Sequence, residues 1–394
     1  MRKLFITLSL LFAICGVTFS QNTLRSGVED VEAYLLTCGP GSEVYSLWGH
    51  SALRVVDKST GQDIVYNWGV FDFATKNFAW KFAKGRLNYM IAASTYKRFL
   101  QDYTSSNRWV KSQKINLNVE EMSNLLDLLD ENMRPENVFY LYDFFYDNCA
   151  TRIRDVIEKA VGNNFLYPIE DNNIKSTFRD EIGKYMKNAL WLNFGTDLIL
   201  GLPTDKKTTM KDRMFLPDGL CEGLSQSQIR RDGRIIPLLT NPTMVVKSDD
   251  SALSKKTIFS PMLVLSLLLI FVVLFSIYAK SPKANRIMDI ILFSIFSLLA
   301  LFMIFFNFFT DHIQCTRNLN IIWLNPCVIV CLIGLILKKP FTTWFKIVFA
   351  LSLLFAVLIF CLPHSFNYAF LPMTLLLAFR SLVHCNFDWF PIDV

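Results

Sequence analysis

Two side chains that can carry out covalent acyl chemistry occur where the chain should display them. His50 is the only histidine among the first 300 residues, and it follows a Trp-Gly pair. Cys149 follows Asn148, a residue type favoured at helix N-caps, so it should lie in the first turn of a helix. A thiol paired with an imidazole base can take an acyl group as a thioester. The pattern predicts Cys149 as a nucleophile and His50 as its base.

The start of a helix should also tune the reactivity of Cys149. Unpaired N–H groups and the positive end of the helix dipole lower the pKa of a thiol and favour the thiolate. The same N–H groups can stabilise the oxyanion that forms when a carbonyl is attacked. The imidazole needs an orienting partner, for which Asn67 in the next strand is our first choice and Asp72 our second.

Short strands and capped helices should position these residues. Strands are predicted at 31–37, 51–57 and 64–66, with a turn at 58–61 that joins the last two as a hairpin. Asn118 and Glu121 have the spacing of a capping box, which starts a helix that runs to Met133. The other predicted helices are 149–161, about 176–190 and about 211–225. The fold class is therefore α+β, with a small antiparallel sheet.

The composition divides the chain into an exported part and a membrane part. Residues 1–20 have the charged start, apolar run and small final residues of a secretory signal peptide. Residues 21–257 contain 30 Lys and Arg against 30 Asp and Glu, as in a globular domain. Five apolar stretches then follow, each close to the roughly 20 residues that cross a bilayer. They lie at about 258–278, 287–309, 321–337, 344–362 and 366–383. The predicted domains are 1–20, 21–257, a multispanning helical bundle at 258–385 and a cytoplasmic tail at 386–394.

Basic residues between the apolar stretches predict the orientation of the chain. If residues 21–257 are outside, one basic residue, Arg317, is outside and seven are inside, as the positive-inside rule requires. The seven are Lys280, Lys283, Arg286, Lys338, Lys339, Lys346 and Arg380. We expect a multi-pass protein of the bacterial inner membrane with its catalytic domain in the periplasm. The formal charge of +6 then reflects topology and not nucleic-acid binding.

The exported domain contains three cysteines, which is an odd number. At least one thiol must stay unpaired in an oxidising compartment, and a disulfide between Cys38 and Cys221 would leave Cys149 free. The sequence has no CxxC, HExxH, GxSxG or glycine-rich phosphate loop. We therefore expect neither a metal nor a cofactor.

Basic and aromatic residues are interleaved between Phe73 and Val119. This stretch contains nine Lys and Arg residues and a single acidic one, Asp102. Beside a membrane such a surface would attract anionic headgroups while its rings settle at the interface. The alternative is a solvated helix face with the rings in the core. His364 and Asn367, in a short outward-facing connection, could also hold a headgroup or be simply interfacial.

Four blocks of the sequence resemble, in matching order, the Lnb-type lipoprotein N-acyltransferases. The blocks are YSLWGHSALR at 45–54, YNWGVFDF at 66–73, FAKGRL at 82–87 and YDFFYDNCATR at 142–152. The resemblance implies a circularly permuted papain-like fold, in which the histidine strand precedes the cysteine helix. It also implies a reaction that moves an acyl chain from a phospholipid to the cysteine, and then to the α-amino group of a lipoprotein's lipid-modified N-terminal cysteine. By this analogy His50 and Cys149 are base and nucleophile, whereas Asn67 remains an inference from the residues.

Two other functions fit part of the pattern. A permuted papain-like peptidase or amidase would use water as the acceptor on cell-wall peptides, but it has no evident need for five membrane helices. A membrane-tethered binding module would bury Cys149 as a small hydrophobic residue and use His50 structurally. The reactivity of the thiol separates this last function from the two enzymatic ones.

Overall fold

The computed structural model describes residues 27–169, 175–249, 258–279 and 281–385, and they form two compact units. The sheet unit contains the described residues up to Lys175 and those from Thr208 to 249. The helical unit contains Ser176–Lys207 and the described residues from 258 onward. The predicted signal peptide at 1–20 and the predicted tail at 386–394 lie outside the described residues.

The division differs from the predicted domains at one place, Ser176–Lys207. This segment was expected within a continuous domain at 21–257, but it belongs to the helical unit. The reason is apolar packing: Leu198 is buried in the core of the helical unit, and the ring of Phe194 lies 5.1 Å from that of Phe370. The chain therefore passes between the units more than once.

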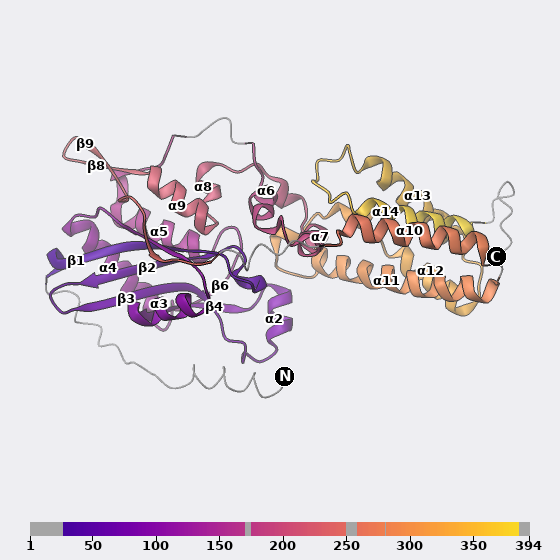
Figure 1. Cartoon of the computed structure of the whole chain (residues 1–394), viewed down its shortest axis with the longest axis horizontal. Coiled ribbons are helices and arrows are strands. Elements are labelled where there is room, and N and C mark those ends of the chain that lie inside the picture. Colours follow the sequence, from indigo (N-terminus) through magenta and orange to yellow (C-terminus); the bar gives the residue numbers. More distant parts are fainter. Residues whose placement is uncertain (1–26, 170–174, 250–257, 280, 386–394) are drawn as a thin grey trace. The chain divides into compact units, whose positions relative to one another are not determined.

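The sheet unit is built on a seven-stranded antiparallel sheet in the order β10-β5-β1-β2-β3-β4-β6 (Figure 1). The strands are β1 (Val31–Cys38), β2 (His50–Asp57), β3 (Gln62–Val70), β4 (Asn88–Thr95), β5 (Val110–Lys114), β6 (Phe139–Leu141) and β10 (Thr243–Val246). A small second sheet consists of β7 (Phe165–Leu166), β8 (Gln228–Arg231) and β9 (Arg234–Pro237). The prediction of an antiparallel sheet, including the β2–β3 hairpin, is confirmed.

Helices cover both faces of the sheet. Successive strand residues point to opposite sides, and apolar side chains on each side need to be buried. On one face, Leu35 and Leu53 are buried in a core shared with α4 (Val119–Met133), α5 (Cys149–Val161) and α9 (Pro217–Gln226). On the other face, Leu36 and Ala52 are buried with aromatic residues of α3 (Tyr96–Ser105). Two short helices, α2 (Phe78–Lys84) and α8 (Met210–Arg213), complete this unit.

Capping signals located helix ends better than apolar periodicity did. The capping box of Asn118 and Glu121 is present at the start of α4, and α5 begins at Cys149 and ends at Val161 as predicted. The single helix expected at about 176–190 is wrong, since α6 (Phe178–Gly183) passes into the 3₁₀ turn η4 (Lys184–Met186). The helix expected at about 211–225 is two helices, because Pro217 lacks an N–H and starts α9 instead of continuing α8.

The helical unit packs five apolar helices against one another (Figure 1). They are α10 (Pro261–Tyr278), α11 (Pro282–Phe308), α12 (Cys327–Leu337), α13 (Thr342–Leu358) and α14 (Phe370–Val383). Each falls within or close to one predicted apolar stretch. Three segments are long and apolar enough to cross a membrane, Pro261–Tyr278, Pro282–Phe308 and Leu319–Leu337, while α13 and α14 are shorter. Many of their large apolar side chains are exposed, as expected of surfaces that face lipid.

A buried ion pair connects three of these helices. The guanidinium of Arg380 on α14 donates to both carboxylate oxygens of Asp289 on α11, at 2.6 and 2.7 Å, and to Ser276 on α10. His384 lies 2.8 Å from the same carboxylate. Arg380 was counted among the basic residues that set the orientation, but it is 1% exposed and lies within α14. Asp289 neutralises its charge inside the bundle, so Arg380 should not be counted when basic residues are used to predict the orientation of the chain in the membrane.

We predict that Asp289→Ala lowers the stability of the helical unit by about 3–5 kcal/mol, because it leaves the Arg380 charge buried without a counter-charge. Thermal unfolding of the purified protein in detergent measures this loss. The double variant Asp289→Leu/Arg380→Leu removes both charges and should recover much of the stability. An unchanged unfolding midpoint in the single variant would contradict a structural role for the pair.

Candidate functional site

The candidate site lies where strands β2 and β3 part. Their pairing runs from Asp57–Gln62 to Leu53–Tyr66, so residues 50–52 and 67–70 extend beyond the paired region. The register of β3 with β4 shifts between Asn67 and Val70. Gly69, within this irregular stretch, has a φ of +86°, which strongly favours glycine. The two strand ends therefore form an opening in the sheet.

The first residue of α5 fills this opening. Cys149 is 9% exposed, and its Cβ lies 3.8 Å from where a Cβ on Gly69 of β3 would be. The backbone N–H of Ser51 on β2 donates a hydrogen bond to the Cys149 sulfur and thereby lowers the pKa of the thiol. Cys149 thus contacts both strands, and on β2 it contacts the residue that follows His50.

Asn148 determines where α5 begins. Its Oδ1 accepts hydrogen bonds from the N–H groups of Ala150 at 2.8 Å and Thr151 at 3.0 Å, as an N-cap should. Its Nδ2 donates to the carbonyls of Phe144 at 2.7 Å and Phe215 at 2.9 Å. A buried amide with all these partners ties the helix start to two other segments, so Cys149 has little freedom to move.

Gly49 positions His50 at the start of β2. It has a φ of +82°, and a Cβ at this residue would lie 2.6 Å from the Cys38 carbonyl oxygen. Only glycine lets the chain turn this close to β1, where His50 pairs with Cys38. The Trp-Gly turn that drew attention to His50 in the sequence is therefore a backbone requirement.

Asn67 contacts the imidazole, as the sequence analysis expected of its first choice. The His50 Nε2 lies 3.2 Å from the Asn67 Oδ1, and the Asn67 Nδ2 donates to the Val65 carbonyl at 3.4 Å. Because the amide turns its oxygen toward the ring, the proton belongs on Nε2. The Nδ1 atom is then the unprotonated nitrogen that can act as a base.

Burial keeps both reactive groups uncharged at rest. It lowers the pKa of His50 to about 4, with the nearby Arg108 guanidinium acting in the same direction and the Asn67 hydrogen bond opposing them. It also raises the pKa of Cys149, and this effect outweighs the hydrogen bonds from the N–H groups of Ser51, Ala150 and Cys149 itself. The expectation of a thiolate at the helix start is therefore wrong, since loss of solvent outweighs the helix terminus.

Two further residues near the site were not singled out from the sequence. The Tyr140 hydroxyl lies 4.0 Å from the Cβ position of Gly69, is buried, and finds no acceptor for its proton among the described residues. The Arg108 Nε donates to the Gly39 carbonyl at 2.9 Å, while its buried Nη2 has no hydrogen-bond partner there. Arg108 lay in the stretch noted for its basic and aromatic composition, and no sequence pattern placed it beside His50. Tyr140 belongs to the aromatic segment Phe139–Tyr146 before Cys149, which was expected to wall the site, but the sequence did not single out its hydroxyl.

Comparison with known families identifies the chain. Residues 19–176, which include His50, Asn67 and Cys149, match the Lnb N-terminal periplasmic domain. Residues 253–388 match the Lnb transmembrane domain. The chain belongs to the Lnb family. It is accordingly a membrane protein with a periplasmic domain. No curated protein and no solved structure matches it.

The disulfide considered for this Lnb-family chain is not formed, because Cys38 and Cys221 are both free thiols. Cys38 is in the core beside α3, on one face of the sheet. The Cys221 thiol donates to Gln113 at 3.1 Å and contacts Thr37, whose side chain points to the opposite face from that of Cys38. Among the described residues, no group of three or more His, Cys, Asp or Glu side chains could hold a metal ion.

The basic and aromatic stretch of the Lnb-family chain has rings of both kinds, buried and exposed. Phe99 and Tyr103 of α3 are in the core, as the solvated-helix alternative required. In contrast, Phe73, Trp80 and Phe82 are more than half exposed around α2. Arg152, the last residue of the block at 142–152, pairs with Asp147 and stacks on Tyr140.

Alkylation by iodoacetamide should report the protonated state of Cys149. At pH 7 its labelling should be slower than that of glutathione, and the rate should rise roughly tenfold per pH unit toward pH 9 because only the thiolate reacts. Mass spectrometry of the Cys149 peptide measures the rate, with denatured protein as the control. Rapid labelling at pH 6 would mean that a thiolate exists at rest. Because burial alone makes labelling slow, a slow rate no longer separates a binding module from an enzyme, and an acyl adduct on Cys149 has to do so.

Proposed function

We propose that this protein is a lipoprotein N-acyltransferase with Cys149 as nucleophile, His50 as base and Asn67 as the group that orients the imidazole. One observation carries the proposal: the sulfur lies in the opening between β2 and β3, next to the strand residue that follows His50. A buried thiol with no chemical role would not need to contact Ser51, the residue after a histidine that an amide side chain holds.

In the first step the thiol attacks an ester carbonyl of a membrane phospholipid. The His50 Nδ1 accepts the thiol proton as the sulfur–carbon bond forms, because a neutral thiol is a poor nucleophile. The Cys149 N–H at the start of α5, which the Asn148 cap does not engage, and the Tyr140 hydroxyl are available as donors to the oxyanion. The imidazolium then protonates the departing alkoxide, which releases a lysophospholipid and leaves an acyl thioester on Cys149.

In the second step the α-amino group of a lipoprotein's lipid-modified N-terminal cysteine attacks the thioester. His50 takes a proton from the attacking nitrogen and returns one to the departing sulfur. The products are an amide on the lipoprotein and the free thiol of Cys149. No metal or cofactor takes part in either step.

Aromatic side chains near α5 can keep water from the thioester. The rings of Trp48 and Phe144 lie 5.0 Å apart, and those of Tyr89 and Tyr142 lie 4.5 Å apart. Exclusion of water favours an amine acceptor over hydrolysis, which a cell-wall peptidase or amidase would need. The Nη2 group of Arg108, which has no hydrogen-bond partner among the described residues, can donate to the phosphate of the donor lipid.

The proposal includes a membrane topology. All five apolar helices would cross the bacterial inner membrane, with α13 and α14 extended by their flanking apolar residues. The sheet unit would lie in the periplasm. Its fold would be papain-like and permuted, with the histidine before the cysteine in the chain. Six of the basic residues used for orientation, without Arg380, still fall on the cytoplasmic side. The exposed rings around α2, together with Lys81 and Lys84, suit contact with anionic headgroups.

We predict that Cys149→Ser and His50→Ala lower N-acylation of a diacylated lipopeptide on the order of 10³-fold or more, because each removes a reacting group. Liquid chromatography with mass spectrometry of lipopeptide and phospholipid measures the transfer. Cys221→Ser, a change at another free thiol of the same unit, should be nearly neutral. Wild-type protein incubated with phospholipid alone should carry an acyl mass on Cys149. Transfer that persists in Cys149→Ser would defeat the proposal, and an adduct that only water discharges would favour an amidase.

The pH profile should distinguish Asn67 from a merely structural residue. Since the His50 pKa is lowered to about 4, His50 stays unprotonated and active as a base down to about pH 5, and the rate should fall only as the pH approaches 4. Asn67→Ala should slow transfer roughly 10- to 100-fold, because it releases the ring orientation. It should also move the acid limb of the profile to lower pH, because it removes the hydrogen bond that raises the His50 pKa. Unfolding midpoints provide the control for stability. Equal rates for Asn67→Ala and wild type would remove Asn67 from the site.

A further inference from the structure

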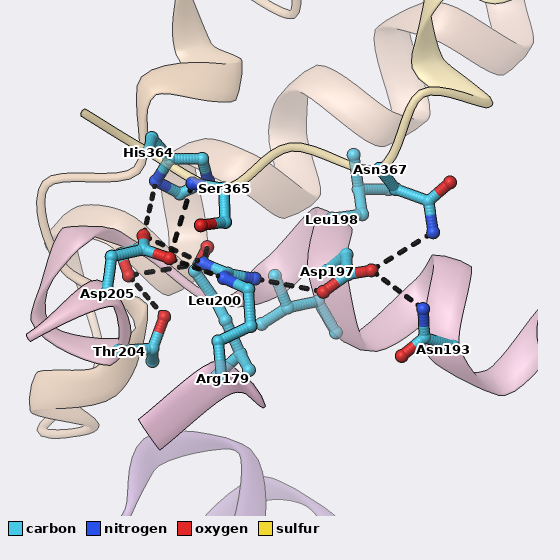
Figure 2. Close-up of polar contacts among 12 residues, drawn as sticks. Arg179, Asn193, Asp197, Leu198, Leu200, Thr204, Asp205, His364, Ser365 and Asn367 are labelled. Atoms are coloured by element: carbon cyan, nitrogen blue, oxygen red, sulfur yellow. Dashed lines mark hydrogen bonds and ion pairs between the residues drawn. The ribbon is translucent and has the colours of Figure 1, made fainter. Parts of the chain in front are cut away.

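A second group of buried charges lies in the helical unit, apart from the residues of the acyl-transfer proposal (Figure 2). Arg179 of α6 is 6% exposed and contacts two carboxylates. Its Nε donates to Asp205 at 2.8 Å, and its Nη1 donates to Asp197 of α7 (Leu190–Ile199) at 3.1 Å. One guanidinium thus faces two carboxylates, which leaves the group with excess negative charge.

The excess negative charge lies on Asp197, which receives fewer guanidinium hydrogen bonds than Asp205. Asp205 receives two guanidinium nitrogens of Arg179 and the N–H of Ser365, and it lies 3.2 Å from the His364 ring. Asp197 receives one guanidinium nitrogen and two neutral amides, those of Asn193 at 2.9 Å and Asn367 at 3.0 Å. Figure 2 shows both amides directed at the same carboxylate oxygen. Amides orient this carboxylate without neutralising it.

Asp197 forms part of the wall of a cavity of about 410 Å³. Asn193 and Asn367 contribute to the same wall, while Met262, Phe366 and Tyr368 supply an apolar and aromatic side. The cavity lies at the N-terminal end of α10 and beside the segment that leads into α14. In the proposed topology these ends are at the periplasmic boundary of the bilayer.

The cavity continues toward surface suited to acyl chains. Leu263 and Leu267 of α10, one and five residues beyond Met262, are 46% and 56% exposed. An amphiphile with its chains along α10 would bring its polar group to the carboxylate. A carboxylate beside aromatic rings favours a cation over a neutral or anionic group.

We infer that this cavity, formed by α7, the start of α10 and the 366–369 segment, binds the primary ammonium group of a lipid through Asp197. The ammonium donates to the carboxylate while Phe366 and Tyr368 cover its apolar side. A quaternary ammonium has no N–H to donate, and an anionic headgroup is repelled. Two sources share this chemistry: the headgroup of an ethanolamine phospholipid, and the free α-amino group of a diacylated lipopeptide.

The inference deepens the proposed function if the bound lipid is a donor or acceptor, but binding itself needs no catalysis. It is therefore tested in the full-length Cys149→Ser protein, which cannot turn over in the proposed mechanism. Native mass spectrometry would count the lipids retained from micelles containing phosphatidylethanolamine, phosphatidylcholine, phosphatidylglycerol, a diacylated lipopeptide or its N-acetylated form. Loss of binding and loss of acyl transfer can then be told apart.

We expect retention of the ethanolamine lipid or of the free lipopeptide to exceed that of its partner without a primary amine at least about tenfold. Asp197→Asn removes the charge at constant size and should abolish this preference. Met262→Trp fills the cavity but leaves the carboxylate in place, and it should also abolish this preference. The inference therefore stays testable even if Asp197→Asn fails to fold. Leu298→Trp, at an exposed apolar position on α11 outside the proposed site, and Asp180→Asn, an exposed acid on α6, are the matched controls.

Retention of the ethanolamine lipid alone identifies a headgroup site, and retention of the lipopeptide alone identifies an acceptor site. Retention of both supports the shared chemistry. Equal retention of phosphatidylethanolamine and phosphatidylglycerol together with equal retention of the two lipopeptides, or a preference that survives both Asp197→Asn and Met262→Trp, would overturn the inference.

Discussion

The candidate site depends on one contact, the entry of the first residue of α5 into the opening between β2 and β3. The opening exists because the pairing of these strands stops at Leu53 and Tyr66. It stays free of side chains at Gly69, whose φ of +86° strongly favours glycine, and Cys149 occupies the space. The N-cap Asn148 then ties this helix end to the Phe144 and Phe215 carbonyls. Sheet, helix and turn thus converge on a single sulfur atom.

Burial of this contact determines its chemistry. A solvated cysteine at a helix N-terminus would tend toward thiolate, but desolvation raises the pKa of Cys149 and lowers that of His50 to about 4. A neutral thiol reacts only when a base removes its proton, and it is less prone to oxidation than a thiolate. Such a state suits a thiol in an oxidising periplasm.

The helical unit shows how buried charge is handled where solvent is scarce. Near the end of α14, Arg380 and Asp289 form a closed pair in which each charge has its counter-charge. Near the start of α10, Arg179 serves two carboxylates, and Asp197 faces a cavity with only part of a counter-charge. The first arrangement connects helices, whereas the second leaves negative potential available to a ligand.

Local signals in the sequence determined much of the secondary structure and the chemistry to look for. The capping residues Asn118 and Asn148, the β2–β3 hairpin and the five apolar stretches each act within a few residues of chain, and each was predicted in its observed place. The bounds were less accurate, since β3 extends to Val70 and α12 begins only at Cys327. The predicted contact of Asn67 with His50 also followed from one hairpin.

Interactions between distant segments were decided by the tertiary structure. Only there do Tyr140 and Arg108 approach the site, do Cys38 and Cys221 lie on opposite faces of the sheet, and does Ser176–Lys207 join the helices. The pKa of Cys149 belongs to the same class, because burial depends on everything that packs around a group, whereas a helix terminus can be recognised in the sequence.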